Sequence, residues 1–347
     1  MAYTTIDDPT IYFNTKLYTG NGSTQSITGV GFQPDWLWIK NRDGSNNHIL
    51  QDVIRGATKS LESDSKTSEV TSSTRVTSFD SDGFSIGSAG TNNTNTNNYV
   101  SWNWLAGGSA SSNSDGGITS SISANTDAGF SIVTWSGNAS AATIGHGLSS
   151  APKWIILKAR NNSNYAWFVG HEKLDSSIPW NKYMTLENTN ALNDDVIWND
   201  TAPTSSVFSV GNYASTNGSG VNFVAYCFLE KKGYSKFGSY TGNGNADGTF
   251  VYTGFKPAWV MIKNISTADP WLMLDNKRDT FNPMEKRLDA DDTDAEATGT
   301  DYADFLSNGF KIIGNLGIHN NSNQNYIYMA FAESPFVNSN GIPTNAR

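Results

Sequence analysis

The chain has 347 residues and a formal net charge of −9 at pH 7, and 16% of its residues are charged. Lys and Arg form no runs, which argues against nucleic acid as a partner because phosphate binding needs clustered cations. No apolar stretch has the length of a membrane span, and the opening MAYTTIDDPT lacks the basic and apolar parts of a signal peptide. We therefore expect a soluble chain, without membrane insertion, that no cleaved signal of its own exports.

Four landmarks recur three times along the chain in the same order. They are a glycine turn, a proline two residues ahead of a tryptophan, a strand ending in glycine, and an aromatic closing strand. The turns are YTGNG (18–22), WSGN (135–138) and YTGNG (240–244), and the closing strands are NYVSWNWLAG (98–107), NFVAYCFLE (222–230) and NYIYMAFAE (325–333). Such repetition predicts three tandem units. The units comprise residues 1–107, 117–230 and 231–347, and residues 108–116 form a Gly/Ser-rich linker that we expect to be flexible.

Alternation within the repeated segments predicts strands. In each closing strand one set of alternate residues is uniformly large, as in Val100, Trp102 and Trp104, which indicates packing on a core. In DWLWIK (35–40) both sets are apolar, so we expect this strand to be covered on one face by a second sheet and on the other by a long connection or a neighbouring unit. The fold class predicted is all-β, with three tandem antiparallel β-sandwich repeats of jelly-roll or Greek-key type.

Two local features complete the prediction of elements. The Gly-Asn-Gly turn after Tyr18 and Thr19 is typical of the turns that join hairpin strands. A dinucleotide-binding loop is not favoured there, because the third glycine of that motif is missing. Helix is expected only around DVIRGATKSL (52–61).

Candidate ligand-binding residues are few. Trp180, Trp198 and Trp271 lie in the long middle parts of the second and third units, where we expect more exposure than in the core strands. Exposed rings at these places would stack on sugars. Asp52 and Arg55 are three residues apart, and Asp275 and Arg278 repeat the spacing, whereas the second unit has His171 and Leu174 there. We keep Asp52 and Arg55 as candidate contacts beside the simpler interpretation of structural pairs.

No catalytic or metal-binding pattern stands out, and we predict no cofactor and no metal. His48, His146, His171 and His319 have no ligand-like spacing. Cys227 lies in a closing strand, where a small buried thiol is expected. The acidic segment LDADDTDAEATGTDYAD (288–304) lacks the ligand spacing of a calcium loop, so a solvated loop is favoured, with a loose calcium site between Asp289 and Asp304 as the alternative.

Long stretches of the chain resemble bacteriophage virion proteins. They are the opening MAYTTIDDPTIYFNTKLYTGNGSTQSITGVGFQPDWLWIKNRDG, the segment DVIRGATK, the bridge SWNWLAGGSASSNSDGGITSSISANTDAGFSIVTWSGN, GYSKFGSYTGNG and the close YIYMAFAESPFVNSNGIPTNAR. Similar chains are labelled tail fibre or tail proteins that carry a domain of unknown function. The resemblance implies a place on the phage particle, after synthesis in the host cytoplasm, and it carries no catalytic residues with it.

Sequence and resemblance together predict a non-enzymatic tail fibre or tail-associated surface appendage, with host-envelope recognition as its role. Expected partners are other virion proteins, further copies of the chain in a homo-oligomer such as a trimer, and a host surface glycan. The first unit, residues 1–107, is expected to anchor the protein. Two alternatives stay open, a capsid decoration protein of the phage head and a polysaccharide-degrading enzyme of the virion, which would need a carboxylate pair.

Overall fold

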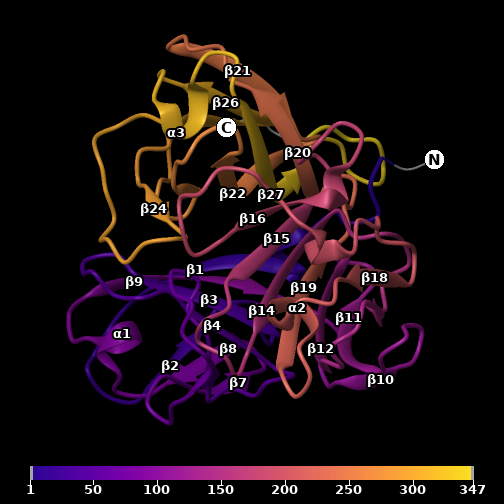
Figure 1. Cartoon of the computed structure of the whole chain (residues 1–347). Helices are drawn as coiled ribbons and strands as arrows, with labels where there is room; N and C mark the ends of the chain where they lie inside the picture. Colours follow the sequence, from indigo (N-terminus) through magenta and orange to yellow (C-terminus); the bar gives the residue numbers. More distant parts are fainter. Residues whose placement is uncertain (1–2, 345–347) are drawn as a thin grey trace.

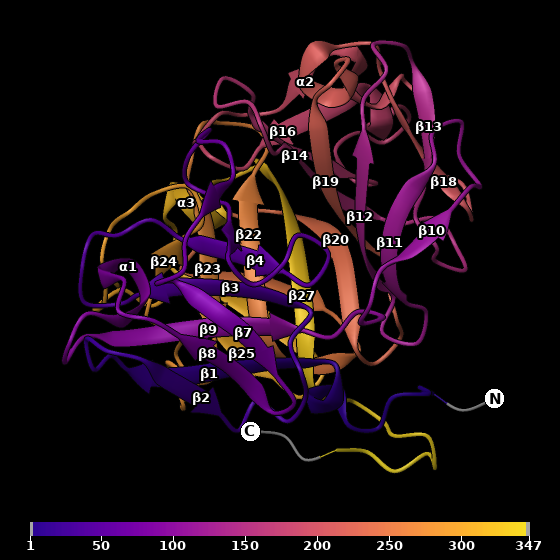
Figure 2. The ribbon, with the colours of Figure 1, turned by 90° about the horizontal axis from the view of Figure 1, so that it is seen from below.

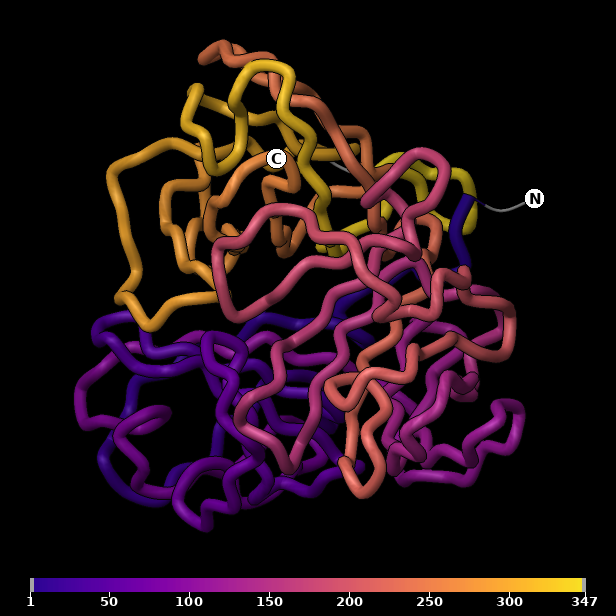
Figure 3. Tube along the Cα trace, in the orientation of Figure 1, coloured from indigo at the N-terminus to yellow at the C-terminus, as the bar shows by residue number. Residues whose placement is uncertain are grey.

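The computed structural model describes residues 3–344, and it confirms the all-β prediction (Figure 1). Antiparallel sheets account for the regular structure, and the helices are single turns. For description we divide the described chain into a first segment (3–107), a second segment (108–230) and a third segment (231–344). These segments occupy different parts of the molecule, as the colours of the tube in Figure 3 show.

The first segment holds two main sheets with a buried cluster between them, which includes Ile27, Leu37 and Phe84. The larger sheet has the order β1-β9-β3-β4, and the smaller has the order β2-β8-β7. The elements are η1 (Pro9–Ile11), β1 (Phe13–Thr19), β2 (Gln25–Thr28), β3 (Trp36–Asn41), β4 (Ile49–Asp52), β5 (Lys59–Ser60), β6 (Val70–Thr71), β7 (Val76–Asp80), β8 (Gly83–Ile86), α1 (Gly90–Asn93) and β9 (Asn98–Trp104).

The second segment has the widest sheet, in the order β10-β11-β12-β19-β14-β15-β16-β17, with the pair β13-β18 apart from it. The buried cluster of this segment includes Val133, Ile155 and Phe208. Its elements are β10 (Ser111–Asn113), β11 (Ser120–Asn125), β12 (Phe130–Ser136), β13 (Ala142–Gly145), β14 (Trp154–Ala159), β15 (Trp167–His171), η2 (Pro179–Asn181), β16 (Lys182–Thr185), β17 (Asn193–Asp194), η3 (Val196–Trp198), β18 (Val207–Val210), α2 (Ala214–Asn217) and β19 (Asn222–Phe228).

The third segment repeats the arrangement of the first, with sheet orders β20-β27-β22-β23-β24 and β21-β26-β25 around a third cluster. Its elements are β20 (Ser235–Thr241), β21 (Asp247–Tyr252), β22 (Phe255–Asn264), β23 (Trp271–Asp275), β24 (Leu288–Asp289), β25 (Ala303–Leu306), β26 (Gly309–Ile313), α3 (Gly317–Asn320) and β27 (Asn325–Pro335). The ends of the chain lie together, since the Ser339 amide donates to the Asp7 carboxylate at 2.6 Å.

Strand register places the repeated tryptophans alike. Trp36 in β3 lies between Trp104 and Asp52 of the neighbouring strands. Trp154 in β14 lies between Phe228 and His171, and Trp259 in β22 lies between Phe331 and Asp275. Residues that align in the sequence therefore hold the same place in three separate sheets, and we call them corresponding residues.

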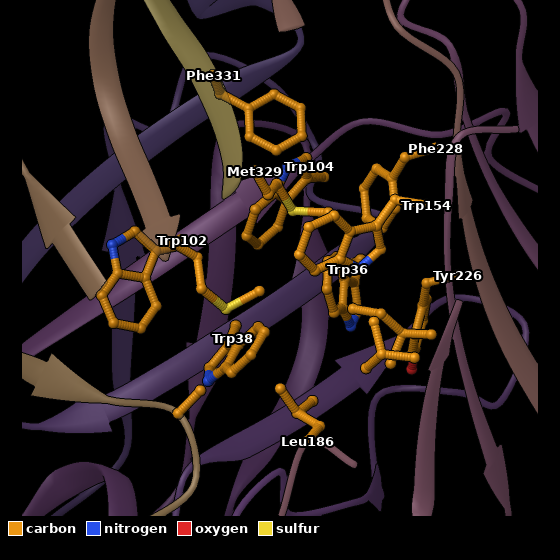
Figure 4. Packing of buried hydrophobic residues seen from close by; sticks show 14 of the residues in the cluster. Trp36, Trp38, Trp102, Trp104, Trp154, Leu186, Tyr226, Phe228, Met329 and Phe331 are labelled. Atoms are coloured by element: carbon orange, nitrogen blue, oxygen red, sulfur yellow. The ribbon is translucent and has the colours of Figure 1, made fainter. Parts of the chain in front are cut away.

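A fourth cluster joins the three segments, and it is built from the large faces of the closing strands (Figure 4). The strands β9, β19 and β27 each turn one face to this shared core and the other to the cluster of their own segment. Rings from different segments are in contact, as in the stack of Trp36 on Tyr226 with centroids 4.4 Å apart. The second cover of DWLWIK is thus the neighbouring segments. The turned view in Figure 2 shows the large sheets of the segments converging on this region.

Two local predictions were wrong. Residues 52–61 form no helix, because the Asp52 carboxylate accepts from the Arg55 amide and Gly56 has a φ of +95°, which turns the chain toward β5. The YTGNG turn joins no hairpin, since β1 pairs with β9 and β2 pairs with β8. Gly20 is needed for another reason: a Cβ there would lie 2.2 Å from the Thr94 carbonyl after α1. The 108–116 segment, predicted as a Gly/Ser-rich linker, includes the short strand β10, which pairs with β11.

Candidate functional site

Lys40, Lys158 and Lys263 are corresponding residues at the ends of β3, β14 and β22, and all are fully buried. Each ammonium group donates to a carbonyl of another segment: the first segment reaches the third, the second reaches the first, and the third reaches the second. The three segments thus contact one another in a closed ring, and we call the segment that is reached the preceding one. Lys40 donates to the Thr293 carbonyl at 2.9 Å, Lys158 to the Lys66 carbonyl at 2.9 Å, and Lys263 to the Thr189 carbonyl at 2.8 Å. Burial lowers the pKa of each of these lysines to about 8.

A second set of crossing bonds lies beside the lysines. His48, Trp167 and Trp271 are corresponding residues, and their ring nitrogens meet carbonyls of the preceding segment at 2.8 to 2.9 Å. Because a carbonyl only accepts, His48 must carry its proton on Nε2, and its Nδ1 then accepts from the Trp38 indole at 2.7 Å. The same contacts thus repeat around the ring from first to second, second to third and third to first segment.

Asp52 and Arg55 form a buried ion pair at 2.5 Å, with both side chains fully shielded. The pair reaches the second segment, because the Tyr226 hydroxyl donates to Asp52 at 2.8 Å and accepts from Arg55 at 3.1 Å. Asp275 and Arg278 repeat the pair at 2.5 Å, and here the Trp102 indole of the first segment donates to Asp275 at 3.1 Å. Both pairs therefore fasten one segment to the next.

Each of these interfaces also has a bridging glutamate. Glu69 contacts Arg55 at 3.3 Å in its own segment and Arg160 of the second segment at 2.9 Å. Glu296 of the third segment contacts Arg278 at 3.2 Å and Arg42 of the first segment at 2.7 Å. The acidic stretch 288–304 thus includes a contact between segments at Glu296.

The interface between the second and third segments is different. Its corresponding residues are apolar or uncharged. Leu174 stands where the other two interfaces have Arg55 and Arg278, and Leu192 stands where they have Glu69 and Glu296. Ile265 replaces Arg160 and Arg42, and Met329 replaces Tyr226 and Trp102. The backbone bond from the Leu192 amide to the Ile265 carbonyl persists at 3.1 Å, beside the crossing bonds of Lys263 and Trp271. His171, which replaces the aspartate, is buried, and burial lowers its pKa to about 3.

This interface opens into a surface groove. One hollow of about 420 Å³ lies between the ends of β14 and β15 and the edge strand β20, and a second of about 750 Å³ continues from it. The two share Lys173, Ser239 and Tyr240. At the interface of the third with the first segment, the corresponding hollow measures about 20 Å³. The hollow is thus open between the second and third segments and almost closed between the third and first. Another hollow, of about 590 Å³, lies over corresponding residues of the second segment, Thr134, Trp135 and Ser136.

Charged and aromatic side chains line the first hollow. Lys153 contacts Glu172 at 3.0 Å and Glu230 at 3.9 Å, and Lys236 contacts Glu230 at 3.5 Å. Phe250 and Tyr252 stand on one face of β21, with 44% and 50% of their surface exposed. These rings and charged groups surround the same hollow.

The tryptophans predicted to be exposed are buried. Trp180 and Trp198 pack edge to face with centroids 5.7 Å apart, over Gly170, where a Cβ would lie 2.6 to 2.8 Å from their rings. Trp271 belongs to the shared core and donates to the Thr185 carbonyl at 2.9 Å. The long middle stretches therefore fold back over their sheets, and none of these rings presents a face for a sugar.

The other candidate groups are also buried or paired. The four histidines are buried, and Cys227 is buried as expected, which raises the pKa of its thiol. Asp289 is paired with Arg287. Among residues 3–344, no three His, Cys, Asp or Glu side chains gather as a metal site would require. None of the helices in the described chain has the length and hydrophobicity of a bilayer crossing.

Sequence reasoning missed the groove and the buried lysines. The groove had one available signal, the loss of charge at residues 174 and 192 relative to the other units. The lysines had another, since a lysine closes each repeated strand motif at the same place, in DWLWIK, KWIILK and AWVMIK.

Comparison with known proteins gives a family without a described activity. No curated protein matches the chain. A family model, described as a domain of unknown function, matches residues 8–335, which span all three segments. The chain therefore belongs to this family, DUF7483.

Proposed function

We propose that the chain is three β-sandwich repeats closed into a ring, and that it serves as a non-enzymatic structural protein of a bacteriophage virion, in a tail fibre or tail-associated surface appendage. The place on the particle rests on the resemblance of its long sequence stretches to phage tail proteins. The structural role rests on the use of its buried charged groups.

One observation carries the structural role: the buried ionic groups are used between segments. Buried charges are costly unless paired, and truncating one member of such a pair costs several kcal/mol (about 3–5). In this chain Asp52 and Arg55 pair with each other and both bond Tyr226 of the second segment, and Lys40 bonds the Thr293 carbonyl of the third. A rigid module that must keep its shape outside a cell benefits from such locks, because they fix one arrangement of the segments.

The shared core changes the argument for a homo-oligomer. Apolar strand faces that would call for further copies if they were exposed are buried within one chain, as Trp36, Trp104 and Trp259 illustrate. Contacts with other virion proteins remain part of the proposal, and they do not need these faces.

The test is gold-labelled antibody against the protein on intact phage particles, viewed by electron microscopy. Label at the tail is the expected result. Label distributed over the head would replace the appendage with capsid decoration, and particles without label would refute a virion location. Particles from a phage with the gene deleted are the control for antibody specificity.

A further inference from the structure

The groove between the second and third segments is bordered by side chains that ion pairs hold in place. At the interface of the third with the first segment, Asn276 donates to Glu333 at 2.6 Å, and Lys256 contacts the same carboxylate at 2.9 Å. The corresponding hollow there is almost closed, with a volume of about 20 Å³. In the second segment Glu172 and Glu230 both turn to Lys153, and the space beside them stays open.

The lining combines two kinds of surface. Phe250 and Tyr252 place two exposed rings side by side on one face of β21, and an exposed apolar patch that polar groups surround marks a binding surface. Next to them, the paired Lys153, Glu172 and Glu230 supply donors and acceptors that mutual contacts hold in place. Tyr328 lines the same hollow, and Gly238 makes room for it, since a Cβ there would lie 2.6 Å from the Tyr328 hydroxyl.

The groove is also long. Past Lys173 and Ser239 it continues over an apolar floor of Leu174, Leu192 and Ile265 to a polar end at Ser266 and Asn325. Each hollow has the size of a small-ligand site, and together they suit an extended ligand with several similar units.

We infer that this groove binds an extended oligosaccharide. A sugar ring has an apolar face of C–H groups and a rim of hydroxyls, so it needs a flat aromatic surface and fixed polar groups side by side. Phe250 and Tyr252 provide the first, and Lys153 with its two glutamates provides the second. The inference deepens the proposed function. Its biological role, the recognition of a host glycan, rests on that proposed function. The binding itself does not depend on a virion location.

The experiment uses the purified full chain on an array of bacterial surface oligosaccharides, followed by calorimetric titration with each oligosaccharide retained. Three variants alter the groove: Phe250→Ala, Tyr252→Ala and Ser239→Trp, which fills the junction of the hollows from an exposed position. Phe281→Ala is the matched control, because Phe281 is 80% exposed and does not line the groove. Tyr252→Phe separates ring stacking from the bond that Tyr252 makes with the Tyr3 hydroxyl at 3.1 Å.

We expect the wild-type chain, Tyr252→Phe and Phe281→Ala to bind equally, and the three groove variants to lose affinity about tenfold or more. Circular dichroism of each variant confirms folding. Absence of any retained saccharide overturns the inference, and so does retention that the groove variants leave unchanged. Binding of extended peptides in place of sugars, lost in Ser239→Trp, would assign the groove to another ligand class. Saccharide binding by a protein absent from virions would refute the proposed function alone.

Discussion

The guanidinium of Arg55 and the hydroxyl of Tyr226 belong to different segments and meet at 3.1 Å, above the Asp52 carboxylate that both contact. All three side chains are buried. The contact spans 171 residues of sequence, so it forms only when the first and second segments dock.

Tyr226→Phe should lower the free energy of unfolding by about 1–3 kcal/mol, because it leaves a buried ion pair short of two hydrogen bonds. Urea unfolding followed by tryptophan fluorescence measures the change. Met329→Leu at the corresponding place is the control, and this volume-conserving change should cost less than about 1.5 kcal/mol. Equal losses in both variants would show that the hydroxyl bonds contribute nothing beyond side-chain volume.

Replacement of Lys40, Lys158 or Lys263 by Met should destabilise the chain by about 1–3 kcal/mol each, because the carbonyls that the ammonium group binds lose their donor inside the protein. Lys277→Met, at an exposed lysine, should stay within about 0.5 kcal/mol of wild type. Thermal melts of the four variants compare these costs. A neutral Lys263→Met would contradict a locking role for its bond to the Thr189 carbonyl.

Residues 1–107 expressed alone should self-associate or precipitate, since Trp36, Trp38, Trp102 and Trp104 would then face water instead of the shared core. Sedimentation velocity measures the association. A well-behaved monomer would contradict the shared core. For the same reason, deletion of residues 1–107 from the full chain would test folding as much as anchoring.

The contribution of two buried carboxyls to stability should fall as pH rises from about 4 to 7. Burial raises the pKa of Asp64 to about 7 and that of Asp291 to about 6, from 3.8, so the folded chain binds more protons in this range than the unfolded chain. Their contribution is full below pH 3.8 and is lost as pH rises through the folded values. Asp64→Asn should therefore remove part of this loss from the pH dependence of the urea midpoint. Asp200→Asn, at an exposed carboxyl, should leave that pH dependence unchanged. The same slope in both variants would rule Asp64 out as its source.

The lysines act in the opposite direction at alkaline pH. Their pKa values of about 8 lie below the ordinary 10.5, so the unfolded chain binds more protons between these values, and the contribution to stability rises with pH there.

The full chain should release no reducing sugar from polysaccharides, as a binding groove without hydrolysis requires. Glu172 and Glu230 share Lys153 in the groove and are the carboxylate pair to examine. A reducing-end assay with the polysaccharides that bind gives the measurement. Sugar release that disappears in Glu172→Gln would make the protein a hydrolase and overturn the structural proposal.

Much of the strand content could be predicted, because the period-two alternation of Val100, Trp102 and Trp104 depends on local sequence alone. What covered each face could not, since that depends on docking between distant segments. The same limit hid the roles of Asp52 and Arg55, whose partner Tyr226 lies in another unit. Trp180 and Trp198 were misjudged because irregular segments give no periodic signal of burial.

The three interfaces between segments of one chain can change independently of one another. In a ring of three identical chains, a mutation at an interface alters all three interfaces at once. Here each interface has its own residues: Arg55 and Arg278 hold two of them, and Leu174 occupies the third. One junction can therefore diversify while the others keep the molecule folded.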